Sequence, residues 1–327
     1  MGASNIMKRV SGFVGAAWGF VVYLLGVILF GAWVRITHSG AGCGDHWPTC
    51  HGEIIPFEPS TETIIEFTHR VTSGMCGIFG FIIIFWAWKK YGRNRVFWAA
   101  VLTQVFIIIE GLIGAGLVLK ELVADNDSVA RAVVISLHLV NTLVLMGAAT
   151  MTAWWAQGGA TPRWFAGRDR QAILLRIGAL LLIATSMSGA ITALGDTLFP
   201  VDALIGEGLW ARVRGDLGPA NHFLVRLRIV HPIVAVLSSV WFLGVAAWTR
   251  YNYGARARLV ANLLGGVVFS QIIIGFVNIG LGAPGWLQLV HLTMAQAVWV
   301  LWLLLWSETA NSGGLDDAVV SGYDDGK

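Results

Sequence analysis

Residues 66–88 read EFTHRVTSGMCGIFGFIIIFWAW, which places an acid, an imidazole and a guanidinium at the start of a long apolar run. The run, Val71 to Trp88, has the length of a membrane-crossing helix, and ionisable residues in such a segment are costly and therefore functional candidates. Glu66 and His69 are three residues apart, so a helix places them on one face. The second half of the chain contains a similar segment, RLRIVHP, at 226–232. We therefore expect His69 to bind one side of a planar, metal-containing group, with Glu66 acting beside it.

The composition identifies a polytopic membrane protein. Of 327 residues, 56% are hydrophobic, only 13% are charged and 16 are Trp, and the mean hydropathy is +0.69. A water-soluble domain normally has about 25% charged residues. The basic residues lie in short loops rather than on one aromatic face, so the sequence indicates no nucleic-acid partner.

Eight apolar segments are each long enough to cross a hydrocarbon layer of about 30 Å as a helix. Lys8 and Arg9 precede the first segment, which is too long for a signal-peptide core and has no small-residue cleavage site after it, so we expect a retained span. The predicted spans are Phe13–Val34, Thr63–Trp88, Val96–Leu119, Val129–Trp155, Ala172–Leu194, Phe223–Trp248, Leu259–Leu281 and Trp286–Trp306.

The distribution of Lys and Arg predicts the orientation. By the positive-inside rule, the loops that are almost purely basic are cytoplasmic together with both termini, and the loops of mixed sign are outside. Residues 311–327, rich in Gly, Ser and Asp, are expected to form a disordered cytoplasmic tail. The basic loops contain Lys89, Lys90, Arg93 and Arg95, then Arg163, Arg168, Arg170 and Arg176, then Arg250, Arg256 and Arg258; the mixed loops contain Asp45, Glu53, Glu58, Asp125, Asp127, Asp196, Asp202 and Glu207.

The two halves of the chain resemble each other. EGLIG at 110–114 resembles QIIIG at 271–275 at an offset of 161 residues, His69 precedes His231 by 162, and His138 precedes His291 by 153. Each half has four spans, an even number, so the halves have the same orientation. We predict an all-α membrane protein made of two tandem four-helix bundles, residues 1–160 and 161–310, with pseudo-two-fold symmetry along the membrane normal.

Four of the eight histidines lie within spans at comparable depths near the outer leaflet. Each half contributes two on non-adjacent helices, which suits the axial ligation of a planar macrocycle from both sides. A single intramembrane histidine more often hydrogen-bonds a neighbouring helix, but four in a repeated pattern favour haem ligation. These four are His69, His138, His231 and His291, whereas His38, His46, His51 and His222 are expected to be solvated or supporting residues.

Charged residues near these histidines have two interpretations. Arg70, Arg226 and Arg228 are placed to pair with haem propionates. Glu66 either forms an ordinary ion pair with Arg70, four residues on, or handles protons at a reactive site. The second half has no acid in the matching place, since Phe223 lies three residues before Arg226 and Arg228 three before His231. This asymmetry favours a division of labour, in which one site reacts and the other transfers electrons.

Cys43 and Cys50 share the first outer loop, which reads GAGCGDHWPTCHG at 40–52. Its glycines and Pro48 allow residues seven apart to meet, and an outside location favours a disulfide over a thiolate metal site. Whether such a disulfide is structural or redox-active stays open. Cys76 lies in an apolar run and is expected to be a packing residue.

Together these motifs resemble one family, haem A synthase. The resemblance rests on the Gly-Cys-Gly-x-x-Trp-Pro-x-Cys loop, the Glu-Phe-Thr-His-Arg stretch, the Glu/Gln-x-x-x-Gly of spans 3 and 7 and the His-Leu of spans 4 and 8, and it extends from Gly31 to about Trp306. Members oxidise the C8 methyl of haem O to a formyl group with oxygen and reducing equivalents, giving haem A for terminal oxidases, and they carry a haem b.

The resemblance implies roles for individual residues. His69 and His138 would flank the substrate haem O with Glu66 as the essential acid, and His231 and His291 would bind the iron of haem b. Cys43 and Cys50 match the paired loop cysteines, while the second cysteine pair that some relatives have between spans 5 and 6 is absent from this sequence. An iron with two histidine ligands has no open position for oxygen, so either His69 or His138 must release it or oxygen must be activated elsewhere.

The resemblance also implies two successive hydroxylations followed by loss of water from a geminal diol. It implies a bacterial cell (inner) membrane location, a haem O synthase as partner and compatibility with a homo-oligomer; the sequence does not identify the electron donor.

Two rival functions share parts of the pattern. A dihaem b-type carrier would oxidise a membrane quinol without modifying haem. A transporter would need a broken midplane helix, for which Gly74, Gly77 and Gly80 are the only indication.

Overall fold

The computed structural model describes residues 12–162, 170–203 and 208–311, and helices are the only regular elements in those ranges. The all-α fold class is confirmed. The predicted tail beyond Asn311 lies outside the described residues, as do Lys8, Arg9, Arg163, Arg168 and Glu207. The long helices are α1 (Gly12–Ile36), α2 (Thr61–Tyr91), α3 (Arg95–Leu119), α4 (Val129–Ala156), α5 (Arg170–Leu198), α8 (Val230–Asn252), α9 (Ala255–Gly280) and α10 (Gly285–Asn311); the short ones are η1 (Ser39–Ala41), α6 (Leu209–Asp216) and α7 (Phe223–Leu227).

Eight helical segments are long and apolar enough to cross a membrane, which confirms the multi-pass prediction. The sixth differs from the expected single helix, because α7 and α8 are separated at Arg228 and Ile229. Pro232 explains the interruption, since its nitrogen carries no hydrogen to donate to the carbonyl of Arg228. By contrast, α2 continues without a break through Gly74, Gly77 and Gly80. The glycines of α2 therefore do not form the broken helix that a transporter would need.

Side-chain caps fix where three of the helices begin. Ser60 accepts a hydrogen bond from the backbone N–H of Thr63 at the start of α2, and Ser128 does the same for Arg131 at the start of α4. Asn94 accepts from Val96 and Phe97 at the start of α3. Each cap satisfies a backbone donor that has no partner within its helix.

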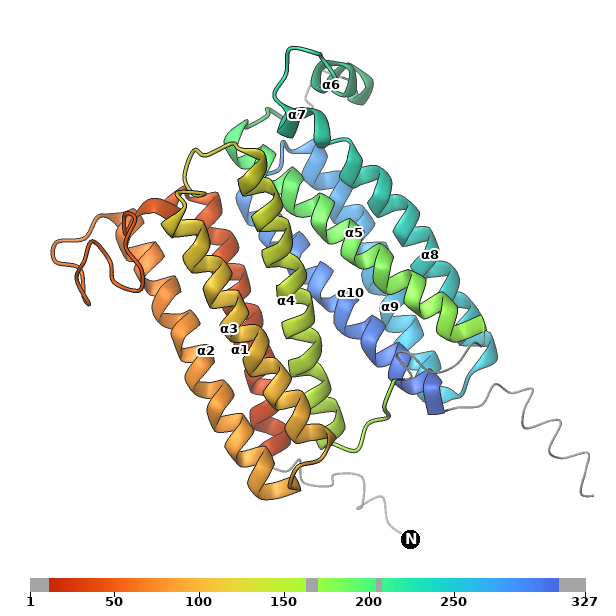
Figure 1. Cartoon of the computed structure of the whole chain (residues 1–327). Helices are drawn as coiled ribbons and strands as arrows, with labels where there is room; N and C mark the ends of the chain where they lie inside the picture. The colour runs from red at the N-terminus through yellow and green to blue at the C-terminus, as the bar shows by residue number, and fades with distance from the viewer. Residues whose placement is uncertain (1–11, 163–169, 204–207, 312–327) are drawn as a thin grey trace, which may run out of the picture.

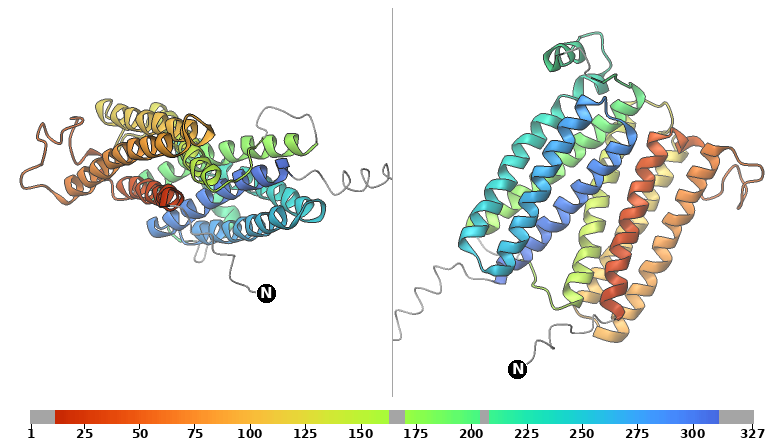
Figure 2. Two further views of the ribbon diagram at one scale, coloured as in Figure 1. Left: turned by 90° about the horizontal axis from the view of Figure 1, so that it is seen from below. Right: turned by 180° about the vertical axis from the view of Figure 1, so that it is seen from behind.

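The long helices form two groups that stand side by side (Figure 1). Helices α1 to α4 pack consecutively and α1 also contacts α4; α5, α8, α9 and α10 pack in the same cyclic way. Contacts of α4 with α5, and of α10 with α1 and α4, join the two groups, as the view from behind also shows (Figure 2). The two-fold relation between the halves and the boundaries 1–160 and 161–310 stay predictions.

The segment between α1 and α2, together with α6 and α7, lies at one end of the molecule, which we call the loop end (Figure 1). Helix α1 begins and α10 ends at the opposite end, as an even number of spans requires. Which membrane face each end occupies stays a prediction.

Tryptophans of α10 fix this helix against α5 in its own half and against α4 in the other half. Trp302 is fully buried, its Nε1 donates to the carbonyl of Leu175 at 3.1 Å, and Gly178 makes room for its ring. Trp299 donates to the carbonyl of Leu143 at 2.7 Å, which ties α10 to α4. Because buried indole N–H groups need acceptors, these bonds fix the rotation of α10 about its axis.

Candidate functional site

A cavity of about 1500 Å³ extends across both halves near the loop end. All four intramembrane histidines line it, on α2, α4, α8 and α10. Pockets for drug-sized ligands typically measure about 300–1,000 Å³, so this cavity has room for more than one ligand of that size. Its remaining lining is mostly apolar, with a small number of charged and amide side chains.

The histidine pair of the second half has the spacing of two ligands on one metal. The ring centres of His231 and His291 are 6.2 Å apart. An imidazole nitrogen binds a transition-metal ion at about 2.0 Å and lies roughly 1.1 Å from its ring centre, so two rings on opposite sides of one metal have centres about 6.2 Å apart. The pair therefore fits a metal held from both sides.

Neighbouring side chains orient these two rings. The hydroxyl of Ser188 lies 3.1 Å from Nδ1 of His231, which leaves the other ring nitrogen for a metal. The amide nitrogen of Gln271 lies 3.3 Å from Nε2 of His291, whose Nδ1 is buried without a partner. Gly189 provides the space for His231, because a Cβ at this position would lie 3.0 Å from its ring.

The pair of the first half, His69 and His138, lines the same cavity. The ring of His69 packs edge-on against Phe30, with ring centres 5.7 Å apart, and a Cβ on Gly31 would lie 3.0 Å from it. Gly31 on α1 thus does for His69 what Gly189 on α5 does for His231. The Nδ1 atoms of His69 and His138 are both buried without a hydrogen-bond partner.

Glu110 is a site residue whose role the sequence did not reveal. Its carboxylate lies 3.6 Å from Nε2 of His138, accepts a 2.5 Å hydrogen bond from the hydroxyl of Thr142, and is also bonded by the Asn141 amide. The signal was present in the sequence, because Glu110 begins the repeated motif that starts with Gln271 in the second half. Only the packing of α3 on α4 shows that this acid faces an imidazole.

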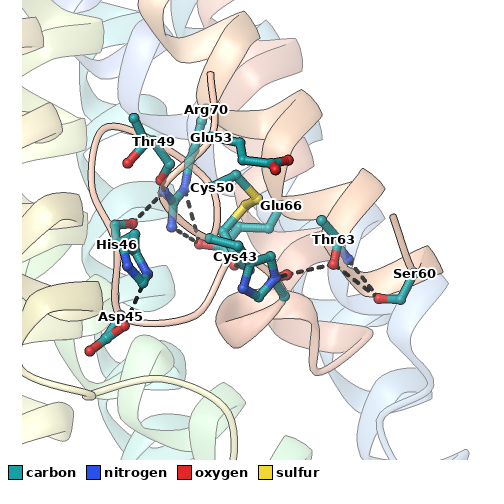
Figure 3. Close-up of a disulfide and its surroundings, with 12 residues drawn as sticks. Cys43, Asp45, His46, Thr49, Cys50, Glu53, Ser60, Thr63, Glu66 and Arg70 are labelled. Atoms are coloured by element: carbon teal, nitrogen blue, oxygen red, sulfur yellow. Dashed lines mark hydrogen bonds and ion pairs between the residues drawn. A yellow bond between two sulfur atoms is a disulfide. The ribbon is translucent and has the colours of Figure 1, made fainter. Parts of the chain in front are cut away.

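Glu66 and Arg70 form a buried ion pair beneath the loop between α1 and α2 (Figure 3). One carboxylate oxygen of Glu66 accepts from Arg70, with Nη2 at 2.5 Å, and the other accepts from the N–H of Cys43 at 2.8 Å. Arg70 also donates to the carbonyls of His46 and Thr49, each at 2.7 Å. The prediction of an ordinary surface pair is therefore incomplete, because Glu66 is only 4% exposed and the pair holds the loop onto α2.

The loop is closed by a disulfide between Cys43 and Cys50, which confirms the prediction of that pairing. Both cysteines are buried beside Glu66 and Arg70 (Figure 3). Cys76 is the free cysteine of the described residues and is buried in the apolar core, as expected for a packing residue.

The arginines expected near propionates lie in different surroundings. Arg226 is exposed and does not line the cavity. Arg228 is buried and lines it, but its guanidinium is paired with Asp196 at 2.9 Å and with Asp216 at 3.9 Å. Burial raises the pKa of the Asp216 carboxyl above its ordinary value, whereas Arg228 and Arg212 act in the opposite direction.

Two further arginines that the sequence did not single out, Arg35 and Arg131, line the loop end of the cavity. Arg131 is 4% exposed; it donates to the carbonyls of Ala124 and Asn126, and its Nε has no partner. Arg35 donates to Gln288 at 2.9 Å and to the carbonyl of Ala193 at 2.6 Å. These residues make the loop end of the cavity a basic surface that suits carboxylates.

Of the remaining histidines, His38 also lines the cavity, whereas His46, His51 and His222 do not, and their supporting role stays a prediction. His222 lies 3.3 Å from Asp127 and stacks on Phe199, which links the loop end of the two halves. His51 is hydrogen-bonded to the carbonyl of Gly42 at 2.9 Å within the disulfide loop. His38 and His46 lie 3.5 Å and 3.0 Å from aspartates on the surface.

Residues 16–303 match the model of one protein family, COX15-CtaA, described as cytochrome oxidase assembly protein. The match covers most of the chain, including all four histidines and the disulfide loop.

Curated relatives carry two different names. The chain is 44% identical over 303 residues to a protohaem IX farnesyltransferase of Thermus thermophilus, covering 91% of this chain and 48% of that protein. It is 48% identical over 93 residues to a haem A synthase of Halalkalibacterium halodurans, covering 28% of this chain and 31% of the relative. It is 41% identical over 102 residues to a haem A synthase of Shouchella clausii, covering 30% and 34%. The chain thus spans half or less of the length of these relatives in each match.

Proposed function

Because this chain belongs to the family of cytochrome oxidase assembly proteins that the COX15-CtaA model describes, we propose that it is a haem A synthase. It oxidises the C8 methyl of haem O to a formyl group by two successive hydroxylations, each of which uses one molecule of oxygen, two electrons and two protons, and water is then lost from the geminal diol. The observation that carries the proposal is the presence of two histidine pairs in one apolar cavity, one of them spaced for a metal between its rings. Relatives named haem A synthase support the same activity.

In this proposal His231 and His291 hold the iron of a haem b, which supplies electrons when bound. Ser188 fixes the orientation of the His231 ring, and Gly189 lets that ring approach α5 closely. Ligand rings whose orientation is fixed by neighbouring groups bind metals more tightly. The mostly apolar cavity wall suits the faces of a macrocycle.

The substrate haem O lies between His69 and His138 in this proposal, with Glu66 as the catalytic acid. The carboxylate of Glu66 is fixed at the cavity wall by Arg70 and by the N–H of Cys43. We assign to it the transfer of a proton from one hydroxyl of the diol to the other, which leaves as water as the carbon–oxygen double bond of the formyl group forms. Whichever of the two histidines releases the iron, Glu66 stays fixed, because its contacts do not involve either ring.

Propionate binding is assigned to the basic surface at the loop end. Arg70 is occupied by Glu66 and by two carbonyls, and Arg226 is exposed, so neither favours the contact that the sequence predicted. Arg131, whose Nε has no partner, and Arg35 are better placed to bind a propionate because both line the cavity. Arg228 also lines the cavity and adds positive charge there, although its guanidinium is paired with Asp196. Arginine is suited to this role because its planar fork matches a carboxylate.

The proposed partner is a haem O synthase. The Thermus thermophilus relative bears the name of a farnesyltransferase, yet about half of its length matches this chain. A single polypeptide that joins the two segments would pass haem O from one to the other without release. We propose that the haem O synthase acts in the same membrane as this chain, the bacterial inner membrane, with both termini of the chain cytoplasmic.

The test is chromatographic identification of the haems bound to the purified protein after co-expression with a source of haem O. We expect haem A or haem O together with haem b in the wild type, and loss of haem b in His231→Ala and His291→Ala. His69→Ala and His138→Ala should keep haem b but form no haem A. His222→Ala, which lies outside the cavity, is the matched control. Haem b alone in the wild type would instead identify a dihaem electron carrier.

A further inference from the structure

The two histidine pairs differ in the residue that faces one of their rings. In the first half a carboxylate, Glu110 on α3, lies 3.6 Å from His138 on α4. In the second half an amide, Gln271 on α9, lies 3.3 Å from His291 on α10. The two residues occupy the same place in the sequence repeat. An acid in the first half is therefore replaced by an amide in the second half at the residue that faces the imidazole.

The surroundings of Glu110 are built to hold a carboxylate. The Thr142 hydroxyl donates to one oxygen at 2.5 Å, and the Asn141 amide donates to the other. When the two halves are aligned so that His138 matches His291, Thr142 corresponds to Ala295 and Asn141 corresponds to Met294. The donors are thus present only in the half that has the acid, and Oε1 of Gln271 is buried without a partner. Three positions differ together, so the carboxylate is not an isolated substitution.

Among the described residues, Glu110 has no ion-pair contact with an arginine or lysine; its one ion-pair contact is His138. A carboxylate within a membrane-spanning helix is costly, and such residues are retained where they serve a function. At 3.6 Å the contact is between charges and is not a hydrogen bond. A negative charge beside a ligand imidazole increases the basicity of that ligand, and the groups around a haem are one of the means by which a protein sets its potential. A neutral amide has a smaller effect on the ring.

We propose that Glu110 is a positioning residue that makes His138 a stronger electron donor to its iron than His291 is to the iron of the second half. Stronger donation stabilises the more oxidised forms of the iron, which suits a site where a substrate is oxidised. The weaker donor, with Gln271, suits a site that gives electrons away. The inference rests on the proposed function, because it requires haem at both histidine pairs.

The test measures the midpoint potential of one haem at a time in the full-length protein, with ferric protohaem as the added probe. The His231→Ala background loads only the first half, and the His69→Ala background loads only the second. Glu110→Gln in the first background should raise the potential enough for a tenfold change in the ferric-to-ferrous ratio, about 59 mV for one electron. Gln271→Glu in the second background should lower the potential in the same measure.

Controls separate an electronic effect from a structural one. Thr142→Val removes one donor to Glu110 and also the hydrogen bond from the Thr142 hydroxyl to the backbone carbonyl of His138. Because the carboxylate charge is then less neutralised, the potential should shift in the opposite direction to Glu110→Gln and by a smaller amount. Glu62→Gln removes an exposed carboxylate of α2 that does not line the cavity, and should leave the potential unchanged.

Two results are decisive against the inference. Normal haem binding with an unchanged potential in both Glu110→Gln and Gln271→Glu would overturn it and leave the proposed function intact. Failure of the wild-type first half to bind protohaem would overturn the proposed function and the inference with it.

Discussion

Replacing Gly189 with alanine separates the stability of this protein from its ability to bind haem b. The added Cβ would lie 3.0 Å from Cε1 and 3.3 Å from Nδ1 of His231. Carbon atoms in contact are normally about 3.5–4.0 Å apart, so the ring has to move by roughly half an ångström. The same change also disturbs the 3.1 Å contact between the His231 ring and Ser188.

The two consequences of this substitution have opposite signs. Alanine is favoured over glycine in a helix by about 1 kcal/mol, so the protein without haem should be as stable as the wild type or slightly more stable. A displaced ligand ring typically lowers metal affinity by about 10–100-fold, and we expect an effect at the lower end of this range.

The assay is titration of haem-free protein with protohaem, followed by absorption, together with thermal unfolding of the haem-free form. Gly244→Ala on α8 is the matched control, because nothing lies within 4 Å of its added Cβ. It should leave haem affinity unchanged. Wild-type haem affinity in Gly189→Ala would refute the reasoning that this glycine exists to admit His231.

Three further predictions follow from contacts described above. Glu66→Gln should leave the protein folded with haem b bound but stop haem A formation, and normal haem A content by chromatography would remove this carboxylate from the mechanism. The double change Cys43→Ser and Cys50→Ser should lower the free energy of unfolding by roughly 2–3 kcal/mol, because the short loop between the two cysteines is no longer closed. Circular dichroism during heating in detergent measures this loss. An unchanged melting temperature would show that Glu66 and Arg70 alone hold the loop. Trp302→Leu should lower the free energy of unfolding by about 3 kcal/mol, because the Leu175 carbonyl loses its donor and a void forms against Gly178. An unchanged melting temperature in the same experiment would contradict this prediction.

The membrane-spanning helices were predictable because hydropathy is a property of short segments. The sequence placed all eight spans, and the basic and mixed loops alternate as the positive-inside rule requires. The interruption at Arg228 and Ile229 was missed because an apolar run looks the same whether or not one turn is distorted. Pro232 was the available signal.

The histidines and the disulfide were predictable from the sequence for a different reason, since repeated motifs and loop cysteines are visible without tertiary structure. The partners of Glu66 and Glu110 were not. Glu66 bonds to the N–H of Cys43, 23 residues away, and Glu110 faces His138 on another helix. Such contacts depend on how each helix is rotated about its axis, which is set by packing between helices and not by the pattern along one of them.

The continuity of the cavity has a consequence for how occupancy is measured. A single cavity connects the two histidine pairs, so molecules bound at the two pairs face one another within it. Filling one half changes the volume and polarity that the other half offers, and by thermodynamic linkage the effect is reciprocal. Haem-to-protein ratios in purified samples should therefore vary with the order and excess of addition, and the two affinities should be determined as a coupled pair.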